Sequence, residues 1–389
     1  MRGVDPVRAE PGELKVETVH KDVVVIGLGA FGSAALWRLA QRGADVAGIE
    51  RHGIGHRRGS SHGATRLFRI ACLEHPGLVP IARKSLELWT SLGTRLGRPL
   101  ARQTGCLSVG TRESRPVSGA IKAATVAGVP VVELGHDELV GRQPQYAGLE
   151  PEDIAVWDPG AGICYPERNV RAHTAAARNL GADVHAHTPV SGFSADRDGV
   201  TVRTPAVEFR ASQVVVAAGA WLGALVPELP LAPRETTMHW FRPRDPASAD
   251  FGLDRFPAFI WERGDGSVLW GHGSDEDYGI KLGLVRADSS TGDEADLTTA
   301  MAEALPGLDP HPAKAGPCMI TDSPDGQFLV GRPPSTSRVV VAGGDSGHGF
   351  KHAAGVGELL AQIVAGEPPF CATDFLDPRR FQGDARPGA

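Results

Sequence analysis

The chain has 389 residues, of which 41% are hydrophobic and 22% charged, an ordinary globular composition with enough apolar material for a sizeable core. Its formal net charge of -6 does not suggest a nucleic acid or an anionic membrane as a partner. The five cysteines are scattered without a CxxC pair, which favours a reducing compartment. The length predicts two domains.

The first residues, MRGVDPVRAEPGELKVETVHK, lack the apolar segment of a secretory signal. The longest apolar run, VVVAAGAWLGALV at 214–226, is too short to cross a membrane and contains glycines. We therefore expect a cytoplasmic protein without a membrane partner, in which residues 1–19 form a flexible tail.

The segment KDVVVIGLGAFGSAALWRLAQRGADVAGIER predicts a strand, a helix and a second strand. Residues 23–26 form a continuous β-branched apolar run, which is typical of a buried parallel strand. A helix with one apolar face follows, and the second strand covers 45–49 and ends at Glu50.

Gly27, Gly29 and Gly32 between these elements fit the pattern G-x-G-x-x-G. The first glycine permits a tight turn, the second lets the backbone approach a pyrophosphate, and the third lets helix and strand pack closely. The phosphates would lie at the helix N-terminus, and Glu50 could accept hydrogen bonds from a ribose. The unit predicts dinucleotide binding, the alternative being a glycine-rich turn in a generic α/β unit. It does not distinguish NAD from FAD.

Later segments repeat this theme. The pattern predicts a helix over 170–180 and a strand that runs into Val190. Residues 199–219 predict two short alternating strands and then a buried strand that ends at Ala218 and Gly219. The segment SRVVVAGGDSGHGFKHAAGVGELLAQIVAG has the strand–glycine–helix pattern again. We therefore expect a discontinuous dinucleotide-binding domain (20–95, 150–225 and 325–389) interleaved with a substrate domain (96–149 and 226–324).

Five blocks carry a family resemblance: GLGAFG, GSSHGATRLFR, YGIKLG, CMITDSPDGQF and GGDSGHGFKHAAGVGE. With them the chain resembles the monomeric sarcosine oxidase family of amine-oxidising flavoproteins, which includes N-methyltryptophan and pipecolate oxidases. The resemblance covers nearly the whole chain after residue 20. It implies an α/β fold, with a Rossmann-like FAD-binding domain of the glutathione-reductase type and an α+β substrate domain built on a mixed sheet.

The resemblance also implies roles for single residues. Cys318 matches the cysteine bonded through sulfur to the flavin 8α-methyl carbon, although a lone cysteine is more often a small buried hydrophobe. Lys281 matches the lysine near flavin N5 that promotes the reaction with oxygen, although lysines are usually solvated. Arg69 and Lys351 match the pair that holds the substrate carboxylate, for which the planar guanidinium fork is suited. Surface salt bridges are the alternative for this pair.

Arg66 and His348 match residues that flank the isoalloxazine ring. The following positions are expected to contact FAD: Gly27, Gly29, Gly32, Glu50, Ser61, Thr65, Arg66, Val190, Gly219, Cys318, Gly344, Gly347, Gly349 and Lys351. His185 and His187 alternate on a predicted strand and could suggest a metal, but no further ligand cluster accompanies them, and we expect none.

Three positions depart from the family pattern. The chain has Val285 where sarcosine-type enzymes have a histidine, Asp345 where an apolar residue is common, and Ile320 in place of an aromatic residue. Since these positions lie near the amine end of the substrate, the substrate side chain stays open. Asp345 could favour a cationic or hydroxylated substrate, or it could be paired structurally.

We expect a monomeric FAD-dependent oxidase of an amino acid with a secondary amine, such as sarcosine, N-methyltryptophan or pipecolate. A hydride passes to flavin N5, the imine hydrolyses, and oxygen yields hydrogen peroxide. Activity should rise toward alkaline pH because the amine reacts unprotonated. The alternatives are a flavin dehydrogenase with another acceptor, a biosynthetic amine or imine oxidase of a specialised metabolite, an NAD-dependent dehydrogenase, and a non-catalytic flavoprotein.

Overall fold

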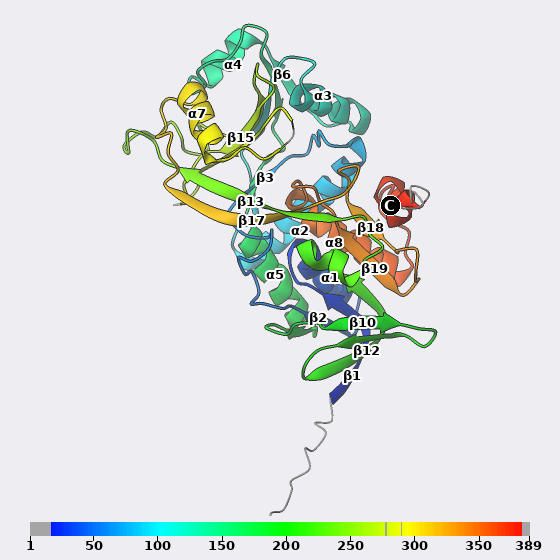
Figure 1. Ribbon diagram of the computed structural model, residues 1–389. Coiled ribbons are helices and arrows are strands. Elements are labelled where there is room, and N and C mark those ends of the chain that lie inside the picture. Colours follow the sequence, from blue (N-terminus) through cyan, green and yellow to red (C-terminus); the bar gives the residue numbers. More distant parts are fainter. Residues whose placement is uncertain (1–16, 277, 289, 383–389) are drawn as a thin grey trace, which may run out of the picture.

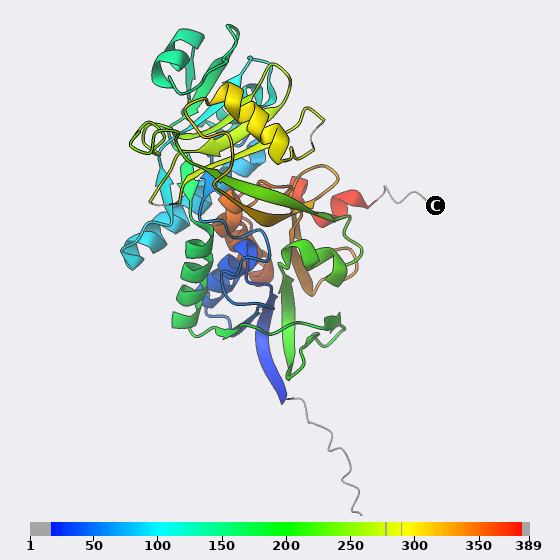
Figure 2. The ribbon, with the colours of Figure 1, turned by 60° about the vertical axis from the view of Figure 1, so that its left-hand side comes forward.

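The computed structural model describes residues 17–276, 278–288 and 290–382. Its two large sheets extend toward opposite ends of the molecule, and the long strands 232–241 and 314–322 of one of these sheets run across the middle (Figures 1 and 2). The α-helices are α1 (Ala30–Gln41), α2 (Val79–Leu96), α3 (Arg115–Ala127), α4 (His136–Arg142), α5 (Pro166–Asn179), α6 (Leu222–Leu225), α7 (Glu294–Ala304) and α8 (Ala353–Ala365). Short 3-10 turns cover Pro76–Leu78, Gly219–Trp221, Phe350–His352, Asp374–Leu376 and Pro378–Phe381.

The first sheet has the strand order β10-β11-β12-β1-β2-β9, with β19 beside β12 and β18 beside β19. These strands are β1 (Glu17–Ile26), β2 (Val46–Ile49), β9 (Asp183–His185), β10 (Gly192–Ala195), β11 (Val200–Arg203), β12 (Val207–Val216), β18 (Leu329–Gly331) and β19 (Val339–Gly343). The central pairs β1–β12, β1–β2, β2–β9 and β12–β19 are parallel. Their carboxyl ends therefore meet at one edge of the sheet, where ligands bind in open α/β folds.

The second sheet has the order β17-β13-β16-β15-β14-β5-β7-β6 and is mixed, because β5 and β14 pair in parallel while its other pairs are antiparallel. Its strands are β5 (Cys106–Gly110), β6 (Val132–Leu134), β7 (Ile154–Asp158), β13 (Ala232–Phe241), β14 (Ala258–Glu262), β15 (Val268–His272), β16 (Ile280–Val285) and β17 (Lys314–Asp322). A small sheet joins β3 (Arg66–Phe68), β8 (Gly162–Cys164) and β4 (Ala101–Gln103).

Helix α1 packs between α5 and α8 over the first sheet, and a large apolar core lies beneath it. A second apolar core lies between α7, α4 and the second sheet, and it includes Phe256, Phe259 and Trp261. The α/β class predicted from the sequence is confirmed. We propose that the two large sheets mark the two interleaved domains.

Several expected elements differ from the structure. β1 begins at Glu17, inside the expected tail, whose residues 1–16 lie outside the described part of the chain. β7 extends the second sheet beyond the expected boundary at residue 149. The expected second alternating strand and the buried strand after it are one strand, β12, whose first half pairs with the hairpin strand β11 and whose second half is enclosed beside β19. β9 ends at His185, so Val190 lies in a loop.

Candidate functional site

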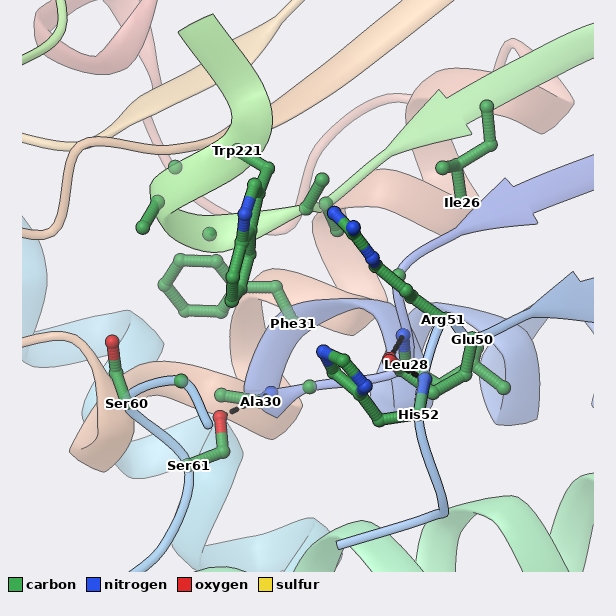
Figure 3. Close-up of a pocket in the computed structure, with 18 of the residues that line it drawn as sticks. Ile26, Leu28, Ala30, Phe31, Glu50, Arg51, His52, Ser60, Ser61 and Trp221 are labelled. Carbon is green, nitrogen blue, oxygen red and sulfur yellow. Dashed lines mark hydrogen bonds between the residues drawn. The ribbon is translucent and has the colours of Figure 1, made fainter. Parts of the chain in front are cut away.

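A cavity of about 360 Å³ lies beyond the carboxyl ends of β1, β2, β12 and β19, at the N-terminus of α1 (Figure 3). The expected site residues that line it are Gly27, Gly29, Glu50, Ser61, Val190, Gly219 and Gly344. They come from segments far apart in the sequence, and the sheet order brings them together. This edge of the sheet is therefore the candidate dinucleotide site.

The turn between β1 and α1 requires two of its glycines. Gly27 has a φ of +86°, a left-handed conformation that other residues rarely adopt. A Cβ at Gly32 would lie 1.8 Å from the Gly27 carbonyl oxygen, so only glycine lets α1 approach the turn this closely. The predicted roles of the first and third glycines of the motif agree with this local geometry.

Glu50 closes the cavity at the end of β2. Its carboxylate accepts hydrogen bonds from the Leu28 and His52 N–H groups, each at 2.9 Å, and the His56 ring lies 3.3 Å away. Burial by itself would raise the pKa of Glu50, but the hydrogen bonds lower it by a larger amount. The pKa of Glu50 therefore lies below its usual value. The carboxylate is therefore ionised and fixed, as an acceptor for ribose hydroxyl groups must be.

The opposite wall carries Ser61 and Trp221. Ser61 Oγ accepts a hydrogen bond from the Ala30 N–H at 2.9 Å, which places this hydroxyl at the N-terminus of α1 (Figure 3). From this wall the Trp221 ring faces the His52 ring in an edge-on arrangement. The chemistry fits FAD: a helix N-terminus for the pyrophosphate, a fixed carboxylate for a ribose, and apolar walls for the rings.

A second group of expected residues lies around Cys318, next to the cavity. The two sites adjoin because Thr321, three residues after Cys318 on β17, lines the cavity. Cys318 is buried, and its Sγ lies 3.7 Å from Nη2 of Arg66. The same guanidinium donates to the carbonyl oxygens of Ser60 and Thr65 at 3.0 and 2.9 Å. A guanidinium held by two backbone carbonyls thus faces the sulfur.

Lys281 lies on β16 and is 1% exposed. Its Nζ donates to the carbonyl oxygens of Gly63 and Thr65 at 3.2 and 3.0 Å, and it lies 5.1 Å from the centre of the Trp240 ring. Burial, and then the charge of Arg66, holds the pKa of Lys281 well below its usual value. Lys281 is therefore not the solvated strand lysine that was the alternative. The Thr65 hydroxyl oxygen is buried and has no partner among the described residues.

Arg69 and Lys351 come together, but on a protein carboxylate that the sequence analysis did not identify. Glu74 Oε1 lies 2.5 Å from Nη2 of Arg69 and 3.1 Å from Nζ of Lys351. All three side chains are buried, with exposed fractions of 6% for Arg69, 7% for Glu74 and 4% for Lys351. Burial raises the pKa of Glu74, yet the two cations hold it well below its usual value. The surface salt bridge that was the alternative is therefore wrong.

The backbone after Arg69 is held by another buried carboxylate. Asp158, at the end of β7, accepts hydrogen bonds from the Ile70 and Ala71 N–H groups at 2.9 and 2.8 Å. Neither Asp158 nor Glu74 stands in a recognisable motif, so no sequence signal could have identified them.

The turn after β19 places the remaining expected residues. The Gly326 carbonyl oxygen accepts a hydrogen bond from His348 Nε2 at 2.9 Å. The His348 ring stacks on Phe328, and burial lowers its pKa to about 4. Asp345 lines the cavity, and burial raises its pKa to about 6. Gly349 lies against the Asp345 carboxylate, and Gly347 faces Ile320.

Within the described ranges no group of three or more histidine, cysteine or acidic side chains could hold a metal ion. His187 lies beyond the end of β9 and has a left-handed backbone conformation. The expectation that His185 and His187 share one face of a strand is therefore wrong. None of the helices in the described part of the chain is both long and apolar enough to cross a membrane.

Comparisons with known proteins identify the family of the chain. A model of the FAD dependent oxidoreductase family (DAO) matches residues 22–363. The chain is 35% identical to a monomeric sarcosine oxidase of Streptomyces avermitilis over 92% of this chain and 97% of the relative. It is 30% identical to an N-methyl-L-tryptophan oxidase of Salmonella agona, over 91% and 97% respectively.

Among solved structures, L-proline dehydrogenase from P. horikoshii superposes with a TM-score of 0.79 at 23% identity, covering 94% of this chain and 98% of that one. This likeness concerns the fold. The family match and the two relatives confirm the predicted resemblance. The chain belongs to the family of FAD-dependent oxidoreductases that includes the monomeric sarcosine oxidases and the N-methyl-L-tryptophan oxidases.

Proposed function

We propose that this protein is an FAD-dependent oxidase of an amino acid with a secondary amine, either an N-methyl or a cyclic amino acid. The observation that carries the proposal is the buried cation pair, Arg69 and Lys351, in a structure that also has a cavity suited to a dinucleotide. Burying two cations side by side is unfavourable unless an anion lies between them. A substrate carboxylate can occupy that place when Glu74 leaves it.

When bound, FAD would supply the two-electron oxidation of the substrate C–N bond with oxygen as the final acceptor, so that the products would be an imine and hydrogen peroxide. Arg69 and Lys351 orient the substrate by its carboxylate, which fixes the position of that carbon. Lys281 supplies positive charge where oxygen becomes negative during reduction. Arg66 and His348 border the site that the flavin ring would occupy.

We further propose that Cys318 forms a thioether with the flavin 8α-methyl carbon. This step would break the S–H bond and one methyl C–H bond, and the two electrons released would go to the flavin and from there to oxygen. Its burial on β17 and the guanidinium of Arg66 at 3.7 Å support this assignment. The enzyme would act as a monomer in the cytoplasm. The imine product would leave the site and hydrolyse in water.

A peroxide assay with purified protein against a panel of N-methyl and cyclic amino acids tests the proposal. Peroxide formed in step with oxidation of an N-methyl or cyclic amino acid is the expected result. Reduction of the flavin without oxygen uptake would instead indicate a dehydrogenase with another acceptor. A flavin that no amine reduces would indicate a non-catalytic flavoprotein, and a colourless protein that reduces NAD would refute flavin chemistry altogether.

A further inference from the structure

One peptide unit lies between Lys281 and an acidic side chain. The Gly63 carbonyl accepts a hydrogen bond from Lys281 Nζ at 3.2 Å, and the Ala64 N–H of the same peptide unit donates to Glu167 Oε2 at 3.1 Å. The Gly63 N–H also donates to Glu167 Oε1, at 2.9 Å. The carboxylate thus binds the N–H side of this turn while the lysine binds its carbonyl side.

The turn is held in a conformation that it would not adopt by itself. Ala64 has a φ of +64°, which is unfavourable for a residue with a side chain, and Gly63 has a φ of +93°. Glu167 lies in the first turn of α5, directly after Pro166, where the helix dipole stabilises a carboxylate. Its two hydrogen bonds therefore fix the strained turn from a rigid element.

Lys281 has only neutral groups in direct contact. Its Nζ contacts are the carbonyl oxygens of Gly63 and Thr65 and the Met238 sulfur at 3.2 Å, and within the described residues it forms no ion pair. A buried ammonium without a counter-ion is strongly disfavoured. An anion nearby is therefore needed if Lys281 is to act as a cation.

The titratable groups around Lys281 come from several elements: Arg66, Cys318, Glu167, Cys164, His62 and His272. Arg66 opposes the charge, and burial keeps the two histidines neutral by lowering the pKa of each to about 4. Burial raises the pKa of Cys164 to about 12, and a thioether at Cys318 would carry no charge. Glu167 is the carboxylate in this set, and no ion pair joins it to another described residue.

We propose that Glu167 is a positioning residue for Lys281, whose ammonium form it stabilises through the dipole of the Gly63–Ala64 peptide. Glu167 contacts the turn and not the lysine itself, so it acts through the backbone. The inference rests on the proposed function, because a charged Lys281 is the group that favours electron transfer to oxygen.

The variant Glu167→Gln tests the charge, since glutamine keeps the size and one acceptor oxygen. Lysine occurs at seven positions of the chain, so the side-chain amines can be followed by NMR in 15N-lysine-labelled holoenzyme. Loss of a signal in Lys281→Met assigns it. We expect the pKa of Lys281 to fall by about one unit or more in Glu167→Gln, because an opposite charge favours the charged form. As the pH rises, reoxidation by oxygen should then begin to slow at a pH that is lower by the same amount. Anaerobic reduction by substrate should stay unchanged.

Further variants separate charge from geometry. Glycine adopts the Ala64 conformation freely, so Ala64→Gly in the Glu167→Gln background relieves the strained turn and should not restore the Lys281 pKa. Glu167→Asp keeps the charge and should shift the pKa less than glutamine does. The matched control is Asp196→Asn, because Asp196 also accepts two backbone N–H groups, at 2.8 and 3.0 Å, in the exposed turn between β10 and β11.

An unchanged Lys281 titration in Glu167→Gln would overturn the proposal, and so would full recovery of the pKa in the double variant. The NMR titration does not depend on turnover. If the wild type proved unable to use oxygen, the proposed function would fail, while the titration would still decide the role of Glu167.

Discussion

Replacing Glu74 with glutamine removes the negative charge that Arg69 and Lys351 share. Glu74 Oε1 lies 2.5 Å from one cation and 3.1 Å from the other. A substrate carboxylate that bridges both cations at this position takes it from Glu74. One that uses only Nε and Nη1 of Arg69, which have no partner among the described residues, does not. In the first case, the wild-type enzyme loses the ionic hydrogen bonds of Glu74 when it gains those to the substrate.

The size of the effect follows from this exchange. A hydrogen bond to a charged group contributes about 1.5–3 kcal/mol. Without competition from Glu74, a carboxylate ligand should bind tighter by about that amount, or roughly 10- to 100-fold. The ligand-free variant keeps two buried cations without their anion, and it should be less stable by about 3–5 kcal/mol.

The pH dependence has a defined sign. Arg69 and Lys351 hold the pKa of Glu74 well below its usual value of 4.5, although burial alone would raise it. A group whose folded pKa is depressed stabilises the fold fully above its unfolded pKa, and this contribution is lost as the pH falls through the folded pKa. The difference in the free energy of unfolding between wild type and Glu74→Gln should therefore be constant above about pH 5. It should become smaller only at acidic pH, as Glu74 takes up a proton.

Calorimetric titration of the holoenzyme with propionate, which has no oxidisable amine, measures the affinity. Propionamide is the uncharged comparison ligand, and its binding should not respond to the variant. The control is Glu87→Gln, which removes an exposed pair with Lys84 (2.6 Å) and should change neither affinity nor stability measurably. Equal or weaker propionate binding in Glu74→Gln would refute the displacement argument.

Other outcomes follow from the same contacts. Wild-type protein should keep its flavin after acid precipitation, and Cys318→Ala should release it; complete release from the wild type would exclude the thioether. Lys281→Met should leave anaerobic reduction within about tenfold, or about 1.4 kcal/mol, and slow reoxidation much further, whereas equal loss in both half-reactions would point to another role. Arg69→Ala should weaken carboxylate binding by about 2–4 kcal/mol, and Arg69→Lys should recover part of that binding energy. If the decarboxylated analogue of the substrate turned over as fast as the acid in the wild type, the carboxylate clamp would be excluded. Gly32→Ala should lower flavin content, measured from the absorbance ratio, because its Cβ would lie 1.8 Å from the Gly27 carbonyl oxygen.

The dinucleotide unit could be predicted from sequence because its signals are local. Buried strand, glycine turn, helix and terminal acid follow one another within about thirty residues. Gly27 is required by the conformation of the turn, and Gly32 by the close approach of α1 to that turn. The family blocks then extended the prediction to Lys281 and Cys318, both of which are buried in the structure.

Segments whose pairing is set by distant strands were harder to predict. The alternating and continuous apolar runs at 200–216 predict separate strands, because an alternating pattern normally marks a half-exposed strand. In the structure β12 changes pattern along its length, since its first half pairs with the hairpin and its second half with β19.

By itself the sequence determined the nucleotide-binding fold, the family and the residue types at the site. Only the tertiary structure placed Glu74 between Arg69 and Lys351, and Glu167 behind the turn that holds Lys281. The physical reason is that the sequence around a carboxylate does not indicate which cation will pair with it. The pairing is decided when chain segments up to 277 residues apart come together in the interior, where an unpaired charge is unfavourable.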